Sequence, residues 1–199
     1  MSITLVVGLG NPGREYTDTR HNLGAAVVDA LATAEKLVWK QQSAFDSVVA
    51  RWDRPGRRPV LLAKPTTFMN ESGRAVRALA GYYKLPNSAI VVSYDDLTIP
   101  LGLVKVSEHG SAGGHNGIAS LLEQLGSGFI RYRLGIGPKQ PAEMDLKDFV
   151  LGRFSPAQRL LVEQQFPSYL AGLRLLIDSG PAHAMNSLNR RVQNEPEQT

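Results

Sequence analysis

The sequence predicts an α/β protein: a single-domain three-layer sandwich with a central, mixed but mostly parallel twisted sheet and helices on both faces. Short runs rich in β-branched residues alternate with longer segments whose apolar residues recur at helical spacing. Such alternation is typical of a parallel sheet covered by helices. The chain has 199 residues, 43% of them hydrophobic, which is enough for one well-buried core.

The strands follow from the β-branched and apolar runs, of which ITLVVG near the start of the chain is the clearest. A linker rich in proline, glycine and arginine, RWDRPGRRP, joins the second run to the third and predicts a hairpin, which supplies the antiparallel strands. The expected strands are residues 3–8, 45–52, 59–64, 89–93, 103–106 and 130–136, with a brief edge strand at 149–151.

The helices follow from apolar residues spaced three and four apart. The expected helices are residues 22–37, 70–85, 116–125, 155–178 and 182–191. Ser155 and Pro156 form an N-cap and a first-turn proline for the long helix, and Gly180 and Pro181 end it. Residues 194–199 lack apolar side chains and predict a disordered tail, so the expected domain spans residues 1–193.

The composition excludes several kinds of site. There is no cysteine, so disulfides and thiolate chemistry are excluded, and the four histidines lack the spacing of a zinc site. We therefore expect no metal. The net charge of +4 is compatible with a polyanionic partner. No signal peptide and no apolar stretch of transmembrane length occurs, which favours a cytoplasmic protein without a membrane partner.

A glycine-rich turn, GLGNPG, follows the first predicted strand. Gly8, Gly10 and Gly13 match the spacing of a dinucleotide-binding turn, which makes a nucleotide-dependent oxidoreductase one hypothesis. In such a turn a helix begins at the third glycine and directs its N-terminus at the pyrophosphate. Here helical periodicity begins only near Asn22, so the spacing of the helix argues against nucleotide binding.

Four polar segments are expected to meet at one edge of the sheet, because ligands of open α/β folds bind beyond the carboxyl ends of the strands. They are the loop after the first strand, PTTFMNESG, YDDLTIP and GSAGGHNG. Within this order, GLGNPGREYTDTRHNLG, KPTTFMNESGRAV, DDLTIPLG and GSAGGHNGIASL together resemble the bacterial-type peptidyl-tRNA hydrolase family. The resemblance implies a monomeric α/β enzyme that needs no cofactor or protein partner and cleaves the ester between a peptide and the terminal ribose of tRNA.

Ester hydrolysis needs an activated water, and a neutral imidazole can take its proton near neutral pH, since histidine has an unperturbed pKa of about 6.5. The resemblance assigns His21, in TRHN, as this general base and Asp95 as the carboxylate that orients it. Without the resemblance, the favoured interpretation of His21 is a capping or hydrogen-bonded histidine at a helix start, and that of Asp95 is a turn carboxylate. Asp96 is chemically equivalent to Asp95 in the sequence alone.

Three asparagines carry further roles by resemblance. Asn11 would sense the amide next to the scissile ester, which favours peptidyl-tRNA over aminoacyl-tRNA, whose ammonium offers no acceptor. Asn70 and Asn116 would bind substrate near the scissile bond, and either could donate to the oxyanion. The structural alternatives are a turn side chain bonded within its own loop for Asn11 and helix N-caps for Asn70 and Asn116.

The resemblance also assigns Tyr16 and Phe68 to contacts with the terminal region of the substrate, against the alternative of core packing. Arg133 would meet the 5′ phosphate of the tRNA. Ser107 stands where a partner lysine is expected, and Lys105 lies two positions earlier on the same face of the strand.

For His115, a histidine that only supports the site or lies at the surface is as good an interpretation as a catalytic role. By the same resemblance, Tyr94 replaces a histidine that relatives often carry. A non-catalytic RNA-binding relative remains the alternative function, because a fold alone does not guarantee activity.

Overall fold

The computed structural model describes residues 3–193, with side chains described through residue 189. The predicted tail, residues 194–199, lies outside the described residues, and the domain bounds stay a prediction. One seven-stranded sheet has the order β2-β3-β4-β1-β5-β7-β6. The strands are β1 Leu5–Gly8, β2 Lys40–Gln42, β3 Ser47–Trp52, β4 Val60–Pro65, β5 Ile90–Pro100, β6 Val104–Ser107 and β7 Ile130–Gly137.

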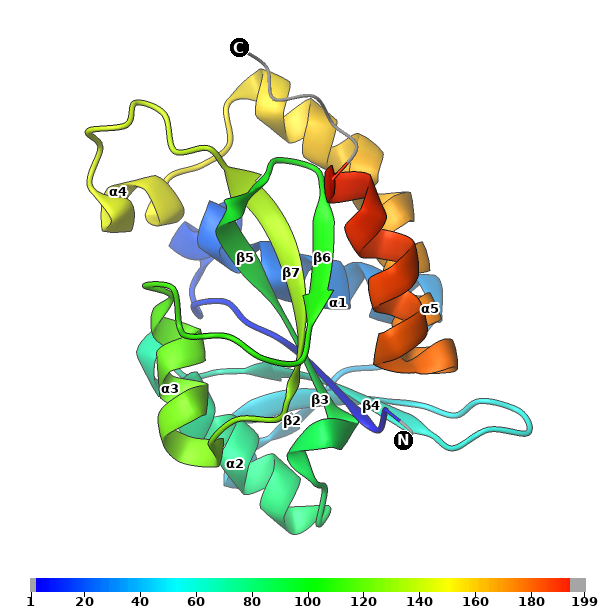
Figure 1. The fold of residues 1–199 in the computed structure, drawn as a ribbon. Helices are drawn as coiled ribbons and strands as arrows, with labels where there is room; N and C mark the ends of the chain where they lie inside the picture. Colours follow the sequence, from blue (N-terminus) through cyan, green and yellow to red (C-terminus); the bar gives the residue numbers. More distant parts are fainter. Residues whose placement is uncertain (1–2, 194–199) are drawn as a thin grey trace.

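The four central strands β4, β1, β5 and β7 are parallel, and the strands at both edges run antiparallel to their neighbours. Helices α1 (Leu23–Ala34) and α5 (Pro156–Gln193) bury their apolar side chains against one face, and α2 (Ser72–Tyr82) and α3 (Asn116–Leu125) against the other. Figure 1 shows these layers on either side of the sheet. The predicted α/β sandwich is confirmed.

Most of the predicted elements occur with small shifts of their ends. The hairpin is β3 and β4, and α3 has the predicted bounds. The two predicted C-terminal helices adjoin at Gly180, which has a non-helical φ of 80°, a left-handed value that glycine adopts without strain. The short strand β2 was not predicted, because its three residues, KQQ, carry no apolar alternation.

Two sequence predictions are wrong. Residues 149–151 do not form an edge strand: they belong to helix α4, Leu146–Leu151. Asp145 caps this helix by accepting a hydrogen bond from the Lys147 backbone N–H, and three apolar residues were too short a run to reveal a period. The strand predicted at 89–93 continues to Pro100, so all of YDDLTIP is strand and not loop.

The sheet gathers four segments at the carboxyl ends of its parallel strands. After β1 come the 3₁₀ turns Arg14–Tyr16 and Arg20–Asn22, and after β4 comes the 3₁₀ turn Met69–Glu71. The C-terminal half of β5 and the N-terminus of α3 complete the set. Among the described residues, no helix is long and apolar enough to cross a membrane.

Candidate active site

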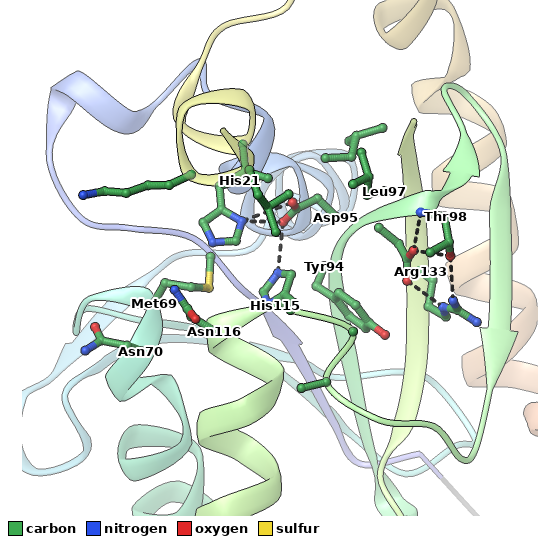
Figure 2. Close-up of a pocket in the computed structure, with 18 of the residues that line it drawn as sticks. His21, Met69, Asn70, Tyr94, Asp95, Leu97, Thr98, His115, Asn116 and Arg133 are labelled. Atoms are coloured by element: carbon green, nitrogen blue, oxygen red, sulfur yellow. Dashed lines mark hydrogen bonds and ion pairs between the residues drawn. The ribbon is translucent and has the colours of Figure 1, made fainter. Parts of the chain in front are cut away.

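A cleft of about 970 Å³ opens where these four segments meet. Figure 2 shows side chains from each segment directed at this space. Every sequence-predicted site residue except Tyr16 lines the cleft, namely Asn11, His21, Phe68, Asn70, Asp95, Asn116 and Arg133. The expectation that ligands bind beyond the carboxyl ends of the strands therefore located the cleft correctly.

His21 lies in the 3₁₀ turn between β1 and α1 and is only 6% exposed. Its Nδ1 is 3.0 Å from Oδ1 and 3.1 Å from Oδ2 of Asp95. A carboxylate only accepts hydrogen bonds, so Nδ1 carries the proton and donates it. Within the described residues, Nε2 has no hydrogen-bond partner and keeps its lone pair.

Asp95 lies on β5, where the residue is 3% exposed. Burial alone would raise the pKa of its carboxyl group, but the attraction of His115 and His21 and their hydrogen bonds outweigh burial and hold this pKa below its usual range. Asp95 is therefore ionised at neutral pH, where it fixes the orientation of the imidazoles bonded to it.

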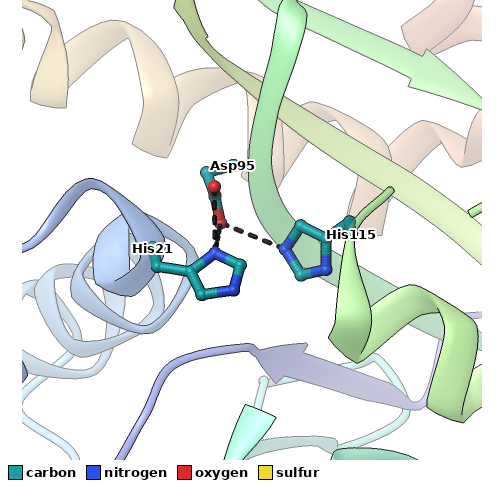
Figure 3. Close-up of side chains that lie close together, drawn as sticks. All are labelled: His21, Asp95 and His115. Carbon is teal, nitrogen blue, oxygen red and sulfur yellow. Dashed lines mark hydrogen bonds and ion pairs between the residues drawn. The ribbon is translucent and has the colours of Figure 1, made fainter. Parts of the chain in front are cut away.

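His115 is the second imidazole on Asp95 (Figure 3). Its Nδ1 accepts hydrogen bonds from the backbone N–H groups of Gly117 and Ile118, at 3.1 and 3.2 Å, so it caps helix α3. Nε2 therefore carries the proton and donates to Oδ1 of Asp95 over 3.1 Å. With both nitrogens occupied, His115 offers no lone pair for taking a proton from water. The sequence signal for its capping role is its place directly before a predicted helix.

The side chain of Asn11 does not bond within its own loop, contrary to the structural alternative. Its Oδ1 accepts a hydrogen bond of 2.8 Å from the backbone N–H of Met69, on the segment after β4. A backbone N–H can only donate, so the carboxamide orientation is fixed with its oxygen on Met69. The Nδ2 group makes no hydrogen bond to the described residues and is free to donate into the cleft that Asn11 lines.

Asn70 and Asn116 are exposed residues on the cleft rim, and neither caps a helix. The capping alternative is wrong for both: α3 is capped by His115, and the 3₁₀ turn and α2 after Asn70 have no side-chain cap bond. Phe68 is 54% exposed beside them, so the core-packing alternative is wrong for Phe68 as well. The two carboxamides make no hydrogen bond to the described residues and the Phe68 ring is exposed, so all three groups are available to a ligand.

Arg133 lines the opposite end of the cleft. Its Nε donates to Oδ2 of Asp96 over 2.8 Å, and its Nη2 donates to Oγ1 of Thr98 over 3.2 Å. Nη1 has no partner among the described residues. Lys105 pairs directly with Arg133 across the β6–β7 ladder, whereas Ser107 pairs with Arg131, whose guanidinium is bonded to the Gly110 and Ser111 carbonyl groups.

Tyr16 is half-buried in the loop that precedes His21 and is absent from the residues lining the cleft. Tyr94 lines the cleft, where its ring meets His115 edge-on with 5.0 Å between the ring centres. Burial raises the pKa of the Tyr94 hydroxyl, so this group stays protonated at neutral pH. Although a tyrosine stands at position 94 where relatives often carry histidine, Asp95 is still bonded to both His21 and His115.

His21, Asp95 and His115 also form a group whose ligand atoms lie within 4.8 Å of one another, a spacing that a metal ion could use. Hydrogen bonds already occupy Nδ1 of His21 and Nε2 of His115, and a metal ion would have to displace both protons. The hydrogen bonds account for the cluster, and the absence of a metal cofactor stays a prediction.

Comparison with known proteins gives one consistent answer. The family model for peptidyl-tRNA hydrolase matches residues 5–197. The chain is 43% identical to the peptidyl-tRNA hydrolase of Gloeobacter violaceus over 98% of both chains, and 42% identical to that of Aquifex aeolicus over 96% of this chain and 98% of the relative. The crystal structure of peptidyl-tRNA hydrolase from Acinetobacter baumannii matches with a TM-score of 0.86 and 34% identity over 94% of each chain.

Proposed function

The chain belongs to the peptidyl-tRNA hydrolase family, and we propose from this premise that it hydrolyses the ester between peptide and tRNA in peptidyl-tRNA, releasing both. This activity recycles tRNA from stalled or prematurely released peptidyl-tRNA. The non-catalytic alternative is not favoured, because the near-full-length relatives are named as the enzyme and the base and its carboxylate are both present.

The observation that carries the proposal is the protonation pattern at His21. Asp95 holds the proton on Nδ1, which leaves Nε2 as the free base at the cleft. A water molecule attacks the ester carbonyl carbon while Nε2 takes one of its protons. When the tetrahedral intermediate collapses, the bond to the ribose oxygen breaks, and the imidazolium returns the proton to that oxygen.

Donors at the rim complete the reaction. The developing oxyanion accepts a hydrogen bond from the carboxamide of Asn70 or Asn116, whose side chains make no hydrogen bond to the described part of the chain. Asn11 donates from Nδ2 to the carbonyl of the amide next to the ester, a group that peptidyl-tRNA has and aminoacyl-tRNA lacks. Phe68 packs against the terminal region of the substrate.

The tRNA body meets the other end of the cleft. Arg133 retains Nη1 for the 5′ phosphate, and Lys105, its neighbour across the ladder, supplies a second cation. Tyr16, on the loop that carries His21, contacts the terminal region of the tRNA from outside the cleft. The proposal includes a monomeric enzyme that needs no protein partner or cofactor and works in the cytoplasm, where its substrate forms.

The test uses N-acetylaminoacyl-tRNA and the same aminoacyl-tRNA without the acetyl group. The wild-type protein is expected to cleave the blocked ester preferentially, and His21→Ala is expected to lower kcat by roughly 10³-fold or more. His183→Ala is the matched control, because His183 is an exposed histidine of α5 outside the cleft. Wild-type activity in His21→Ala would contradict the assignment of the base, and no cleavage by the wild type would favour the RNA-binding alternative.

A further inference from the structure

We propose that Asn22, the residue after the base, is a positioning residue that sets the preference for blocked esters by fixing Asn11. The proposal rests on the proposed function, since the preference is a property of that hydrolysis. Asn22 lies outside the glycine turn and its side chain makes no helix-cap bond. The residue is only 9% exposed and is absent from the residues that line the cleft, so its burial needs another reason.

The first observation is a reciprocal pair of hydrogen bonds. The backbone N–H of Asn11 donates to Oδ1 of Asn22 over 2.8 Å, and Nδ2 of Asn22 donates to the carbonyl of Asn11 over 2.9 Å. One carboxamide therefore satisfies both backbone groups of a residue eleven positions earlier. The two bonds together fix the position of the Asn11 backbone relative to the turn that carries His21.

The second observation is that the Asn22 side chain does not make the helix-cap bond that its position predicts. It is the N-cap residue of α1, and asparagine at an N-cap normally accepts from the backbone of the first helical turn. Its side chain makes no cap bond, and the N–H of Ala25 donates to the Leu9 carbonyl over 2.9 Å instead. Because the β1 loop supplies this acceptor, the Asn22 carboxamide is free to bind Asn11.

The third observation explains one glycine of the GLGNPG turn. A Cβ added at Gly10 would lie 3.1 Å from Cγ and 3.2 Å from Oδ1 of Asn22, and 3.0 Å from Cβ of Ala25. These separations are tighter than side chains normally tolerate. Gly10 therefore leaves the space that the Asn22 carboxamide occupies against Asn11.

The contacts form a chain that ends at the substrate. Asn22 holds the backbone of Asn11, the Met69 N–H holds Oδ1 of Asn11, and the remaining donor of Asn11 is left at the cleft. That donor matches the carbonyl acceptor of a blocked amino acid and has nothing to offer an ammonium group. A displacement of the Asn11 backbone therefore reduces the stabilisation of the transition state for the blocked ester more than for the unblocked ester.

The chain provides a matched control in Asn189. Its Oδ1 accepts from the Val106 N–H over 2.8 Å, and its Nδ2 donates to the Val106 carbonyl over 2.9 Å, so it makes the same reciprocal pair at the edge strand β6. Replacing Asn189 removes two hydrogen bonds comparable to those of Asn22, at a position far from Asn11 in the sequence. Asn189→Leu therefore measures the effect of lost stability alone.

The experiment measures kcat and KM of the full-length protein on N-acetylaminoacyl-tRNA and on the same unblocked aminoacyl-tRNA. Asn22→Leu removes both bonds at similar volume, and Asn22→Asp retains an acceptor for the Asn11 N–H but places an oxygen against the Asn11 carbonyl. We expect the ratio of kcat/KM between the two substrates to fall about 10-fold or more in Asn22→Leu, with Asn22→Asp between it and the wild type. Asn189→Leu should lower the Tm with no change in this ratio.

A ratio that stays at the wild-type value in folded Asn22→Leu would overturn the proposal, as would an equal fall in Asn189→Leu. If Asn22→Leu does not fold, Asn22→Asp and Gly10→Ala decide, because the added methyl of Gly10→Ala presses on the Asn22 carboxamide and must lower the same ratio. Failure of the proposed function is a separate result: there the wild type itself does not cleave the blocked ester.

Discussion

The two ends of the cleft are built on neighbouring carboxylates of one strand. Asp95 accepts hydrogen bonds from His21 and His115 (Figure 2), whereas Asp96 accepts from Arg133 and Thr98. Successive side chains of a strand point to opposite faces of the sheet, so one step along β5 separates the two environments. Two residues that the sequence leaves equivalent thus receive different partners from the strand geometry.

The partners decide what each end can do. The imidazoles on Asp95 are held with fixed protons and one free lone pair, an arrangement suited to moving a proton. Arg133 cannot lose its proton, so the arginine end can only bind charge, and Asp96 offsets part of the charge of Arg133. We therefore propose that the histidine end carries the chemistry and that the arginine end binds tRNA.

The largest expected effect comes from exchanging the carboxylate at each end for an amide. Asp95→Asn removes the negative charge and replaces one acceptor oxygen by an NH2 donor, so the proton is no longer held on Nδ1 of His21 and kcat for the blocked ester should fall about 10²- to 10⁴-fold. Asp96→Asn should leave kcat within about threefold of the wild type, because Asp96 contacts neither imidazole. Single-turnover cleavage assays measure both, and equal losses in the two variants would remove the distinction between the ends.

A smaller effect is expected from the arginine end. Arg133→Ala removes a charge-assisted donor for a phosphate, so KM for full-length N-acetylaminoacyl-tRNA should rise about 10-fold, with kcat nearly unchanged. A minimal ester that lacks the tRNA body should be cleaved at the wild-type rate. Lys105→Ala, the change at the paired position on β6, tests whether the neighbouring lysine adds to the effect. Equal losses on the minimal ester and the full substrate would contradict the phosphate assignment.

The sequence located the cleft and its residues better than it located their environment. His21, Asn11 and Asp95 were found by their motifs, but the extension of β5 through Asp95 was not, because polar residues in a strand resemble a loop. The pairing of β5 with β7 as far as Asp96 imposes the strand there. The contacts of His115 with Asp95 join positions 20 apart, and spacing along the chain carries no signal for such a contact.

The surroundings of the cleft depended even more on tertiary structure. Helix α4, which contributes Leu146 and Val150 to the cleft, was predicted as an edge strand in its second half. Arg20 donates to the Phe149 carbonyl and lies over the Phe149 ring, so packing against the turn that carries His21 holds this helix in place. A short amphipathic helix held by one distant arginine has no period long enough to recognise.

The smallest expected effect is on stability in acid, where the buried carboxylate can be compared with an exposed one. Burial raises the pKa of Asp95, but the attraction and hydrogen bonds of His115 and His21 outweigh it, so the folded-state pKa lies below the ordinary value of 3.8. The ionised group therefore contributes stability that is fully present above 3.8 and is lost as the pH falls through the folded-state pKa. The free energy of unfolding of the wild type should fall toward that of Asp95→Asn below about pH 4, by at most about 1.4 kcal/mol per pH unit.

Asp53→Asn, at an exposed carboxylate paired with exposed Arg51, should show no such convergence, because solvent screens that pair. Urea denaturation between about pH 3 and pH 6 measures all three proteins, and a constant difference between wild type and Asp95→Asn would show that the two imidazoles do not favour the ionised carboxylate.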